Sequence, residues 1–241
     1  MAVTRSVVFD FDGTLAIGHG PVLAYAKAVA PSAGEAFVSR VEEALRAFDA
    51  GSPMYRDGYH IVGELAAQDG VSSWTMQQAY QTSREILGTA KAPVKAPDEV
   101  VPLLEGLSQH AHVHLATNAP RVGVERVLDS WGVYHCFDQL HFNVGKPDGL
   151  YPILRQLLKN GPVLAVGDII EFDLQPAFDL GADTALVGAT ATGTNAEVTM
   201  RGATLTDLRG ELCAWVSQSP TLTPPHSPSH PTPSPKGISH A

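Results

Sequence analysis

The sequence has little positive charge, few cysteines and no long hydrophobic run. Lys and Arg together number 16 against 25 Asp and Glu, which gives a formal net charge of −9. Because nucleic-acid binding needs a basic face that neutralises phosphates, we expect no nucleic-acid partner. The two cysteines, Cys136 and Cys213, are too few for a disulfide framework or a zinc site. This cysteine usage indicates two small reduced side chains in a reducing compartment.

Membrane and export signals are equally scarce. No apolar run approaches the ~18–20 residues that a transmembrane helix requires, and the segment before the first hydrophobic run, residues 1–5, is too short for a secretory signal. We therefore expect a cytoplasmic protein without a membrane partner, either a monomer or a homodimer. The hydrophobic share is 44% and the charged share 17%, below the usual ~25%, which favours a compact core. A length of 241 residues suggests one large domain, or one domain with an inserted module.

Short hydrophobic segments alternate with amphipathic segments along most of the chain. Strands are predicted at residues 7–9, 113–116, 139–142, 163–166 and 184–187. Helical spacing of apolar residues is found at residues 100–107, 120–131, 150–158, 174–178 and 208–216. Strand–helix alternation with short connections predicts an α/β fold with a Rossmann-like, doubly wound parallel sheet.

Residues 16–97 interrupt this alternation. Apolar residues in this segment follow helical spacing, as in the stripe Phe37, Val41, Leu45, and proline and glycine separate the stripes. The pattern predicts a helical cap domain inserted after the first strand. The core domain is then expected to comprise residues 1–15 and 98–216.

The last segment, residues 217–241, has a different composition. It is rich in Ser, Thr, Pro and His, and seven of the chain's 18 prolines lie between Pro220 and Pro235. Such a segment has almost no apolar side chains to bury, so we expect a disordered tail.

The first predicted strand ends in a group of acidic residues and glycine. Asp10 and Asp12 flank Phe11, and Gly13 and Thr14 follow. Glycine lets the chain turn, so both carboxylates can face the crevice at the carboxyl edge of the sheet, where ligands of α/β proteins gather. A carboxylate pair of this kind can divide the work between a nucleophile and a general acid/base. A plain turn after a strand is the alternative.

Two further polar groups follow predicted strands. Thr117 and Asn118 come directly after residues 113–116, just before a helix start, a position that suits an anion but also suits an ordinary helix cap. Lys146 lies between Gly145 and Pro147 in the loop after residues 139–142. Taken alone, a loop lysine is usually exposed to solvent.

Acidic residues also follow the strand at 163–166. Asp168 lies just beyond its end, Asp173 lies five residues further on, and Glu171 is between them. Carboxylate oxygens are the ligands that Mg²⁺ prefers, so the segment is a candidate metal site. A solvated acidic loop is the alternative.

The order of the four groups is more specific than any one of them. Asp-x-Asp-Gly-Thr, then Thr-Asn, then Gly-Lys-Pro, then Gly-Asp-x-x-x-x-Asp, each after a hydrophobic strand, resembles the haloacid dehalogenase-like (HAD) hydrolase superfamily over residues 6 to about 216. The helical insertion is similar to the C1-type cap of the phosphoglycolate-phosphatase-like branch.

This resemblance implies a role for each residue. Asp10 would be the nucleophile that forms an aspartyl-phosphate, and Asp12 the general acid/base. Mg²⁺ would be held by Asp10, by the Asp12 carbonyl and by Asp168, with Asp173 nearby or bound to the metal through water. Gly13, Thr117, Asn118 and Lys146 would bind the phosphate. Because two carboxylates repel a phosphate dianion, Mg²⁺ and Lys146 must neutralise that charge before phosphoryl transfer.

The favoured function is therefore a Mg²⁺-dependent phosphatase for a small phosphorylated metabolite. A phosphomutase shares every residue named above, and a non-catalytic binding protein on the same fold is the alternative from another class. Haloacid dehalogenases proper lack the second aspartate, which is present here as Asp12, and need no metal. The candidates for cap residues that contact substrate, of which only one or two are expected to matter, are His19, Arg46, Arg56, His60, Arg84 and Lys91.

Overall fold

The computed structural model describes residues 4–188, 191 and 193–218, and within these it shows a six-stranded, all-parallel sheet in the order β3-β2-β1-β4-β5-β6. The strands are β1 (Ser6–Phe9), β2 (His112–Ala116), β3 (Gln139–His141), β4 (Val163–Gly167), β5 (Asp183–Leu186) and β6 (Met200–Arg201). Nine α-helices accompany them in the described part of the chain. The α/β prediction is confirmed.

Strand β1 lies at the centre of the sheet because both of its faces are apolar. All four of its residues are buried, and it pairs in parallel with β2 (Val8 opposite His114) and with β4 (Val8 opposite Ala165). A strand covered on both faces needs a continuous hydrophobic run rather than alternation. Its end therefore delivers the next residue, Asp10, to the middle of the carboxyl edge.

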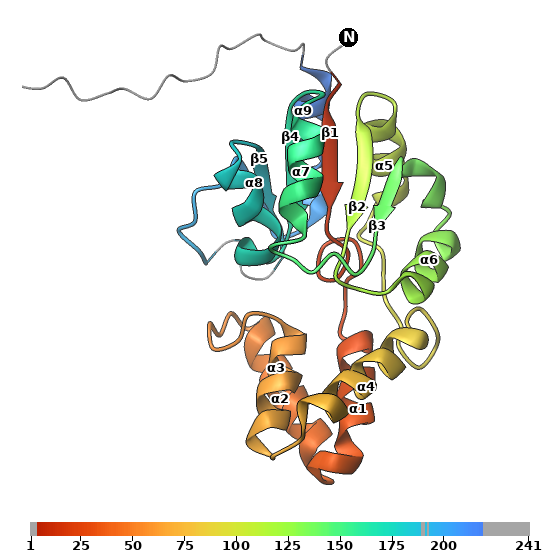
Figure 1. The fold of residues 1–241 in the computed structure, drawn as a ribbon, viewed down its shortest axis with the longest axis vertical. Helices are drawn as coiled ribbons and strands as arrows, with labels where there is room; N and C mark the ends of the chain where they lie inside the picture. Colours follow the sequence, from red (N-terminus) through yellow and green to blue (C-terminus); the bar gives the residue numbers. More distant parts are fainter. Residues whose placement is uncertain (1–3, 189–190, 192, 219–241) are drawn as a thin grey trace, which may run out of the picture.

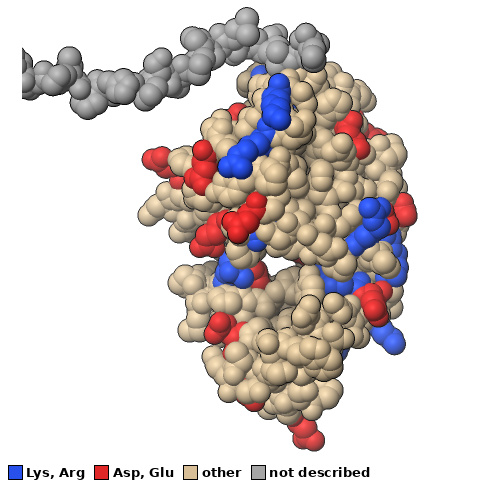
Figure 2. Space-filling model, in the orientation of Figure 1, with Lys and Arg blue, Asp and Glu red and all other residues tan. Residues whose placement is uncertain are grey.

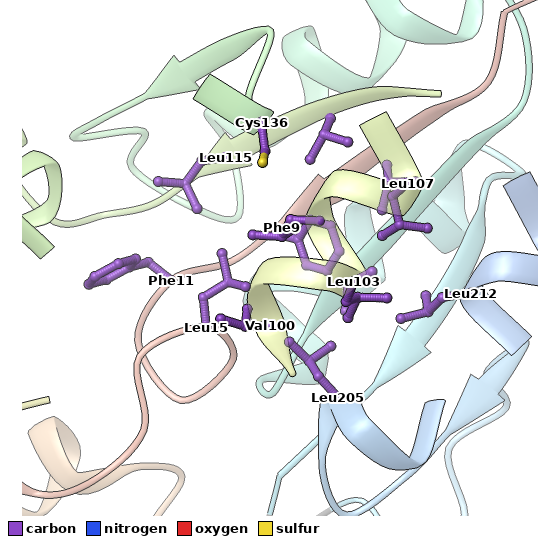
Figure 3. Packing of buried hydrophobic residues seen from close by; sticks show 14 of the residues in the cluster. Phe9, Phe11, Leu15, Val100, Leu103, Leu107, Leu115, Cys136, Leu205 and Leu212 are labelled. Carbon is purple, nitrogen blue, oxygen red and sulfur yellow. The ribbon is translucent and has the colours of Figure 1, made fainter. Parts of the chain in front are cut away.

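Helices cover both faces of the sheet (Figure 1). On one face, α5 (Val100–Ser108), α6 (Arg121–Ser130) and α9 (Leu205–Ser217) share a buried hydrophobic cluster with Val7 and Phe9 of β1. Figure 3 shows Phe9 beside Leu103 and Leu107 of α5. On the other face, α7 (Leu150–Leu158) and α8 (Gln175–Asp179) pack against Val8 and its neighbours. Burial on both sides makes the sheet a rigid platform for the groups at its edge.

Four helices lie between β1 and α5 in sequence and form a separate bundle below the sheet in Figure 1. They are α1 (Gly20–Ala33), α2 (Phe37–Asp49), α3 (Gly58–Gln68) and α4 (Ser73–Glu85). This helical insertion has its own buried core, which includes Val29, Phe37 and Ile61. Helices α3 and α4 begin at side-chain caps, where Asp57 and Ser72 each accept a backbone N–H bond.

The two chain segments that join the helical insertion to the sheet run side by side. The backbone N–H of Ile17 donates to the carbonyl of Lys95 at 2.9 Å, and the N–H of Lys95 donates to the carbonyl of Ile17 at 3.0 Å. The insertion therefore leaves and rejoins the sheet at one place, facing the carboxyl ends of the strands.

Two elements differ from the sequence prediction. Strand β6 was not predicted, because two residues are too few to show a pattern. Residue Leu174 was assigned to a helix but closes a π-helical turn, η2 (Ile170–Leu174), and α8 starts one residue later. The proline-rich tail predicted from residue 217 lies outside the described residues from 219 onward, and Ser217 is the last residue of α9. Within the described part of the chain, none of the helices has the length and apolar character needed to cross a membrane.

A histidine lies buried on the α7 side of β2. His114 is 4% exposed, neither of its ring nitrogens has a hydrogen-bond partner among the described residues, and its ring stacks on that of His141 at 6.2 Å between centroids. Burial lowers the pKa of His114 to about 4, and Asp138 only partly opposes this shift. Folding is therefore linked to the protonation of this ring.

We expect the fold to lose stability as the pH falls through this range. The unfolded chain binds a proton near pH 6.5 and the folded chain only near pH 4, so the contribution of His114 is fully present above the higher value and is lost progressively below it. His114→Phe should flatten this part of the pH dependence, so that the wild type loses several degrees more in midpoint temperature on acidification than the variant does. Thermal unfolding at a series of pH values measures this. Substitution of the exposed His110 by Gln should leave the dependence unchanged, and identical curves for wild type and His114→Phe would contradict the prediction.

Candidate active site

The carboxyl ends of the central strands face a cleft between the sheet and the helical insertion. Figure 2 shows the surface hollowed between the two parts. The cleft has a volume of about 350 Å³, which is within the usual range for small-molecule sites. Asp12, Gly13 and Asp168 line it from the sheet, and Asp49 and Arg56 are among the residues that line it from the insertion.

Lys146 lies between two carboxylates at the edge of the sheet. Its Nζ donates to Oδ1 of Asp10 at 2.6 Å and to Oδ1 of Asp173 at 2.7 Å, and its side chain is 3% exposed. The other oxygen of Asp173 accepts the N–H of Ile169 at 3.0 Å, which fixes that carboxylate in the η2 turn. The lysine that the sequence alone would leave in solvent is thus buried. One Asp10 oxygen, Oδ2, accepts no bond from Lys146.

Asp168 completes an acidic cluster with Asp10 and Asp173, in which one ligand oxygen from each residue lies within 4.8 Å of the others. Oδ1 of Asp168 is buried and has no hydrogen-bond partner among the described residues. Its carboxylate lies against Gly13, where a Cβ atom would be 2.2 Å from Oδ2 of Asp168. Gly13 also has a φ of +86°, in the region that favours glycine. The turn after β1 can therefore approach the acid only because it carries no side chain.

Burial perturbs the charged groups of this cluster strongly. It raises the pKa of Asp10 to about 7, with Lys146 opposing the shift and Asp173 adding to it. It also raises the pKa of Asp168 well above the usual range, and Asp10 and Asp173 contribute further. For Lys146, burial lowers the pKa, but Asp10 and Asp173 outweigh this effect and raise it above its ordinary value. Three carboxylates share one ammonium, so the cluster needs further positive charge to be fully ionised.

A divalent cation fits this need. Three carboxylates at this spacing, one of them with an unpartnered buried oxygen, make an oxygen-rich donor set of the kind that Mg²⁺ takes up. A bound cation would supply the missing charge and favour the ionised carboxylates. Asp10 and Asp168, which the sequence predicts as metal ligands together with the Asp12 carbonyl, both lie in this cluster, and so does Asp173. Their binding of a metal stays a prediction.

The carboxylate of Asp12 is bound by other residues than the carboxylate of Asp10. Both of its oxygens accept bonds from Arg84 of α4, Oδ1 from Nη1 at 2.9 Å and Oδ2 from Nη2 at 3.0 Å. Oδ1 also accepts the hydroxyl of Tyr59 of α3 at 3.2 Å. The Asp12 side chain is 26% exposed and lines the cleft. The second aspartate of the motif is therefore held by the helical insertion.

Thr117 and Asn118 lie at the end of β2, next to β1. The Thr117 hydroxyl accepts the N–H of Ala119 at 3.0 Å, and its residue is 1% exposed. Oδ1 of Asn118 accepts the backbone N–H of Lys146 at 2.8 Å, so it fixes the loop that carries the lysine. The structure thus joins Asn118 to Lys146, whereas no hydrogen bond among the described residues joins Thr117 to the acidic cluster.

The six basic candidates of the helical insertion fall into different positions. His19 and Arg56 line the cleft, each already paired with an acid, His19 with Asp49 at 2.9 Å and Arg56 with Asp57 at 3.1 Å. Arg84 reaches Asp12. Arg84 does not line the cleft itself, and neither do the other three candidates, Arg46, His60 and Lys91, among the described residues.

Tyr59 is not among the residues that the sequence pattern marks as candidates. A tyrosine in an amphipathic helix gives no signal of its own, because its hydroxyl becomes relevant only through its contact with a residue 47 positions away. The sequence pattern does not show that α3 and α4 lie together over the end of β1.

Gly13→Ala is expected to cost most of the activity while the rest of the fold persists. The added Cβ would overlap the Asp168 carboxylate and require a φ that alanine rarely adopts. Because the displaced acid is a candidate metal ligand, the concentration of Mg²⁺ for half-maximal activity should rise by at least tenfold. Gly106→Ala is the matched control, since a Cβ there meets nothing within 4 Å. Unchanged metal dependence in Gly13→Ala would contradict the close approach.

The family follows from comparison with known proteins. The haloacid dehalogenase-like hydrolase family model matches residues 4–181, most of the chain, and the chain belongs to this family. It is therefore a hydrolase. No curated protein matches this sequence significantly.

Solved structures share the fold at low sequence identity. HAD-hydrolase YfnB from Bacillus subtilis, solved bound to magnesium, is 15% identical with a TM-score of 0.58, over 87% of this chain and 98% of YfnB. A HAD-superfamily hydrolase from Geobacter sulfurreducens is 18% identical with a TM-score of 0.57, over 88% and 97% of the two chains. A HAD phosphatase from Thermococcus onnurineus is 17% identical with a TM-score of 0.53, over 86% and 97%. At these identities the likeness concerns the fold.

Proposed function

We propose that this hydrolase is a Mg²⁺-dependent phosphatase that cleaves a small phosphorylated metabolite through a phosphorylated aspartate. The observation that carries the proposal is the placement of Asp10, which is bound on one oxygen to Lys146 and clustered with Asp168. Asp168 has a buried oxygen without a partner among the described residues and lines the cleft of about 350 Å³. A carboxylate so placed has one oxygen free to attack, beside a site for a cation.

The chemistry runs in two steps, each of which balances. In the first, the free oxygen of Asp10 bonds to phosphorus, the bond from phosphorus to the ester oxygen breaks, and Asp12 gives its proton to that leaving oxygen. In the second, a water oxygen bonds to phosphorus, the bond from phosphorus to Asp10 breaks, and Asp12 takes the proton of the water. Asp12 is thereby returned to its starting state, as general acid/base catalysis requires.

The residues around Asp10 would hold the cation and the phosphate. Asp10, the carbonyl of Asp12 and Asp168 are proposed as the direct Mg²⁺ ligands, with Asp173 acting through Lys146 or through a water. When bound, Mg²⁺ supplies positive charge that offsets the repulsion between the carboxylates and a phosphate dianion. The backbone of Gly13 and Asn118, the Thr117 hydroxyl and the Lys146 ammonium are the proposed donors to the phosphate oxygens.

The helical insertion is proposed to act as a cap over this cleft. Arg56 supports this role, because its guanidinium lies over the ring of Phe172 in the η2 turn at 4.4 Å, so it bridges the insertion and the sheet. A cap in this position limits the size of the substrate and excludes water from the reacting groups.

Release of inorganic phosphate from p-nitrophenyl phosphate, with Mg²⁺ and with EDTA, tests the proposal. The wild type should turn the ester over only when Mg²⁺ is present, and a panel of phosphorylated sugars, nucleotides and small acids should then reveal a preferred substrate. Transfer of the phosphoryl group within a sugar phosphate, without release of phosphate, would favour a mutase instead. No turnover of any ester would contradict the proposal.

A further inference from the structure

Arg84 is buried more completely than any other charged residue near the cleft, at 1% exposure, and it comes from the last turn of α4. Its Nη1 donates to Oδ1 of Asp12 and also to the hydroxyl of Tyr59, at 2.5 Å, while Nη2 donates to Oδ2 of Asp12. The rings of Tyr59 and Tyr80 lie at 5.8 and 5.9 Å from the guanidinium carbon. Burying a guanidinium is costly, and Nε of Arg84 has no hydrogen-bond partner among the described residues. A contact that holds both terminal nitrogens in spite of this cost calls for a role.

The two oxygens of Asp12 accept different numbers of hydrogen bonds. Oδ1 accepts two donors, Nη1 of Arg84 and the hydroxyl of Tyr59, and each carboxylate oxygen offers about two acceptor sites. Oδ2 accepts one donor, Nη2 of Arg84, among the described residues. The oxygen that still has a site for a further hydrogen bond is therefore Oδ2, on a side chain that lines the cleft.

The fork of an arginine also fixes the plane of the carboxylate that it binds, which the point charge of a lysine does not do. Together with the tyrosine hydroxyl, it leaves Asp12 a single orientation. Since Asp12 belongs to the sheet and both donors belong to α3 and α4, that orientation exists only while the helical insertion is in this position.

We propose that Arg84 and Tyr59 are positioning residues that orient Asp12 so that Oδ2 exchanges the proton with the ester oxygen and with water. This inference rests on the proposed phosphatase function and adds to it that the insertion, through these two side chains, makes the acid/base competent. A cap that has moved away takes the orienting groups with it, so proton transfer is confined to the closed arrangement.

Two esters that differ only in their leaving group separate this role from a merely structural one. The leaving phenol of phenyl phosphate is about as weak an acid as tyrosine, pKa about 10, so its departure depends on a proton from Asp12. The nitro group of p-nitrophenyl phosphate stabilises the departing phenolate, and this ester depends on the proton far less. A misoriented acid should therefore slow the first ester more than the second, whereas a damaged fold slows both alike.

The variants are Arg84→Lys, which keeps the charge and loses the fork, and Tyr59→Phe, which removes only the hydroxyl. In Arg84→Lys we expect kcat for phenyl phosphate to fall by at least about tenfold more than kcat for p-nitrophenyl phosphate, within the ~10²–10⁴-fold worth of a general acid. Tyr59→Phe should show the same difference between the two esters, but a smaller one. This variant tests the proposal if Arg84→Lys does not fold. The matched control is Arg40→Lys, whose arginine binds Asp69 on the outside of the insertion at 2.8 Å, and it should show no such difference.

Equal losses on both esters, in an otherwise active enzyme, would overturn the positioning role and leave the proposed function standing. If the wild type hydrolyses neither ester with Mg²⁺, the proposed function fails and the positioning role fails with it. A double-mutant cycle of Arg84→Met, which removes both the charge and the donors, and Asp12→Asn adds an independent check on the free energy of unfolding, measured without substrate. Additive effects in that cycle would mean that the contact is absent in solution, which would also overturn the inference.

Discussion

Replacing Asp10 by asparagine is expected to abolish turnover and leave the fold intact. The amide is nearly isosteric with the carboxylate and can still accept a bond from Lys146 at the position of Oδ1. It cannot attack phosphorus, so the loss should amount to many orders of magnitude, beyond the ~10²–10⁴-fold that a missing acid/base costs. The measurement is phosphate release under Mg²⁺ saturation, with thermal unfolding to verify the fold.

Asp69→Asn is a suitable control for this variant. Asp69 pairs with Arg40 on the outside of the helical insertion, so its loss should leave activity near that of the wild type. Burial raises the pKa of Asp10 to about 7, and removal of this buried carboxylate relieves part of the repulsion in the cluster. Asp10→Asn is therefore expected to be at least as stable as the wild type. Substantial turnover by a clean Asp10→Asn preparation would contradict the role of Asp10 as nucleophile.

Asp168→Ala is expected to produce the second largest effect, a sharp rise in the Mg²⁺ requirement. Asp168 brings a buried oxygen without a partner into the acidic cluster, and its loss removes one of three carboxylates there. Activity should fall by at least ~100-fold at Mg²⁺ concentrations that saturate the wild type, and it should recover only partly at higher concentrations. Metal titration of activity, together with direct Mg²⁺ binding by calorimetry, measures this.

Asp173→Ala provides the comparison. Asp173 binds Lys146 and the backbone of Ile169, so its removal should disturb the lysine more than the metal and raise the Mg²⁺ requirement less. The roughly 10–100-fold effects typical of groups that orient a metal ligand are expected. Equal Mg²⁺ dependence in wild type and Asp168→Ala would show that the cation is held elsewhere.

The arrangement of the sheet edge was predictable because it depends on local patterns. Hydrophobic runs give the strands, and the polar residue that follows each run must lie at the carboxyl edge when the strands are parallel. This reasoning placed Asp10, Lys146, Asp168 and Asp173 near one another, and the structure brings these four together.

The contacts of the helical insertion could not be predicted from the sequence pattern. Helix α1 is apolar on most of its sides, with buried residues from Pro21 to Val29, so it shows no clear stripe. Arg84 was one basic residue among six candidates, and Tyr59 was not considered at all. Their meeting at Asp12 depends on how four helices pack over the sheet, and amphipathic spacing specifies which face is buried but not which neighbour buries it.

The place where the helical insertion leaves and rejoins the sheet also affects how the chain folds. Central strand β1 pairs with residues 106 positions away in β2 (Ser6 with His112) and 157 positions away in β4 (Ser6 with Val163). Such distant pairings carry a large loop-closure entropy and slow the search for the native topology. If the four helices fold first around their own core, the two backbone hydrogen bonds between Ile17 and Lys95 hold the two ends of the helical insertion together. The effective loop between β1 and β2 then shrinks to a short connection. Pulsed hydrogen exchange during refolding should therefore detect protection of the α1–α4 amides before protection of the β1 amides. Simultaneous protection would show that the sheet forms without prior folding of the helices.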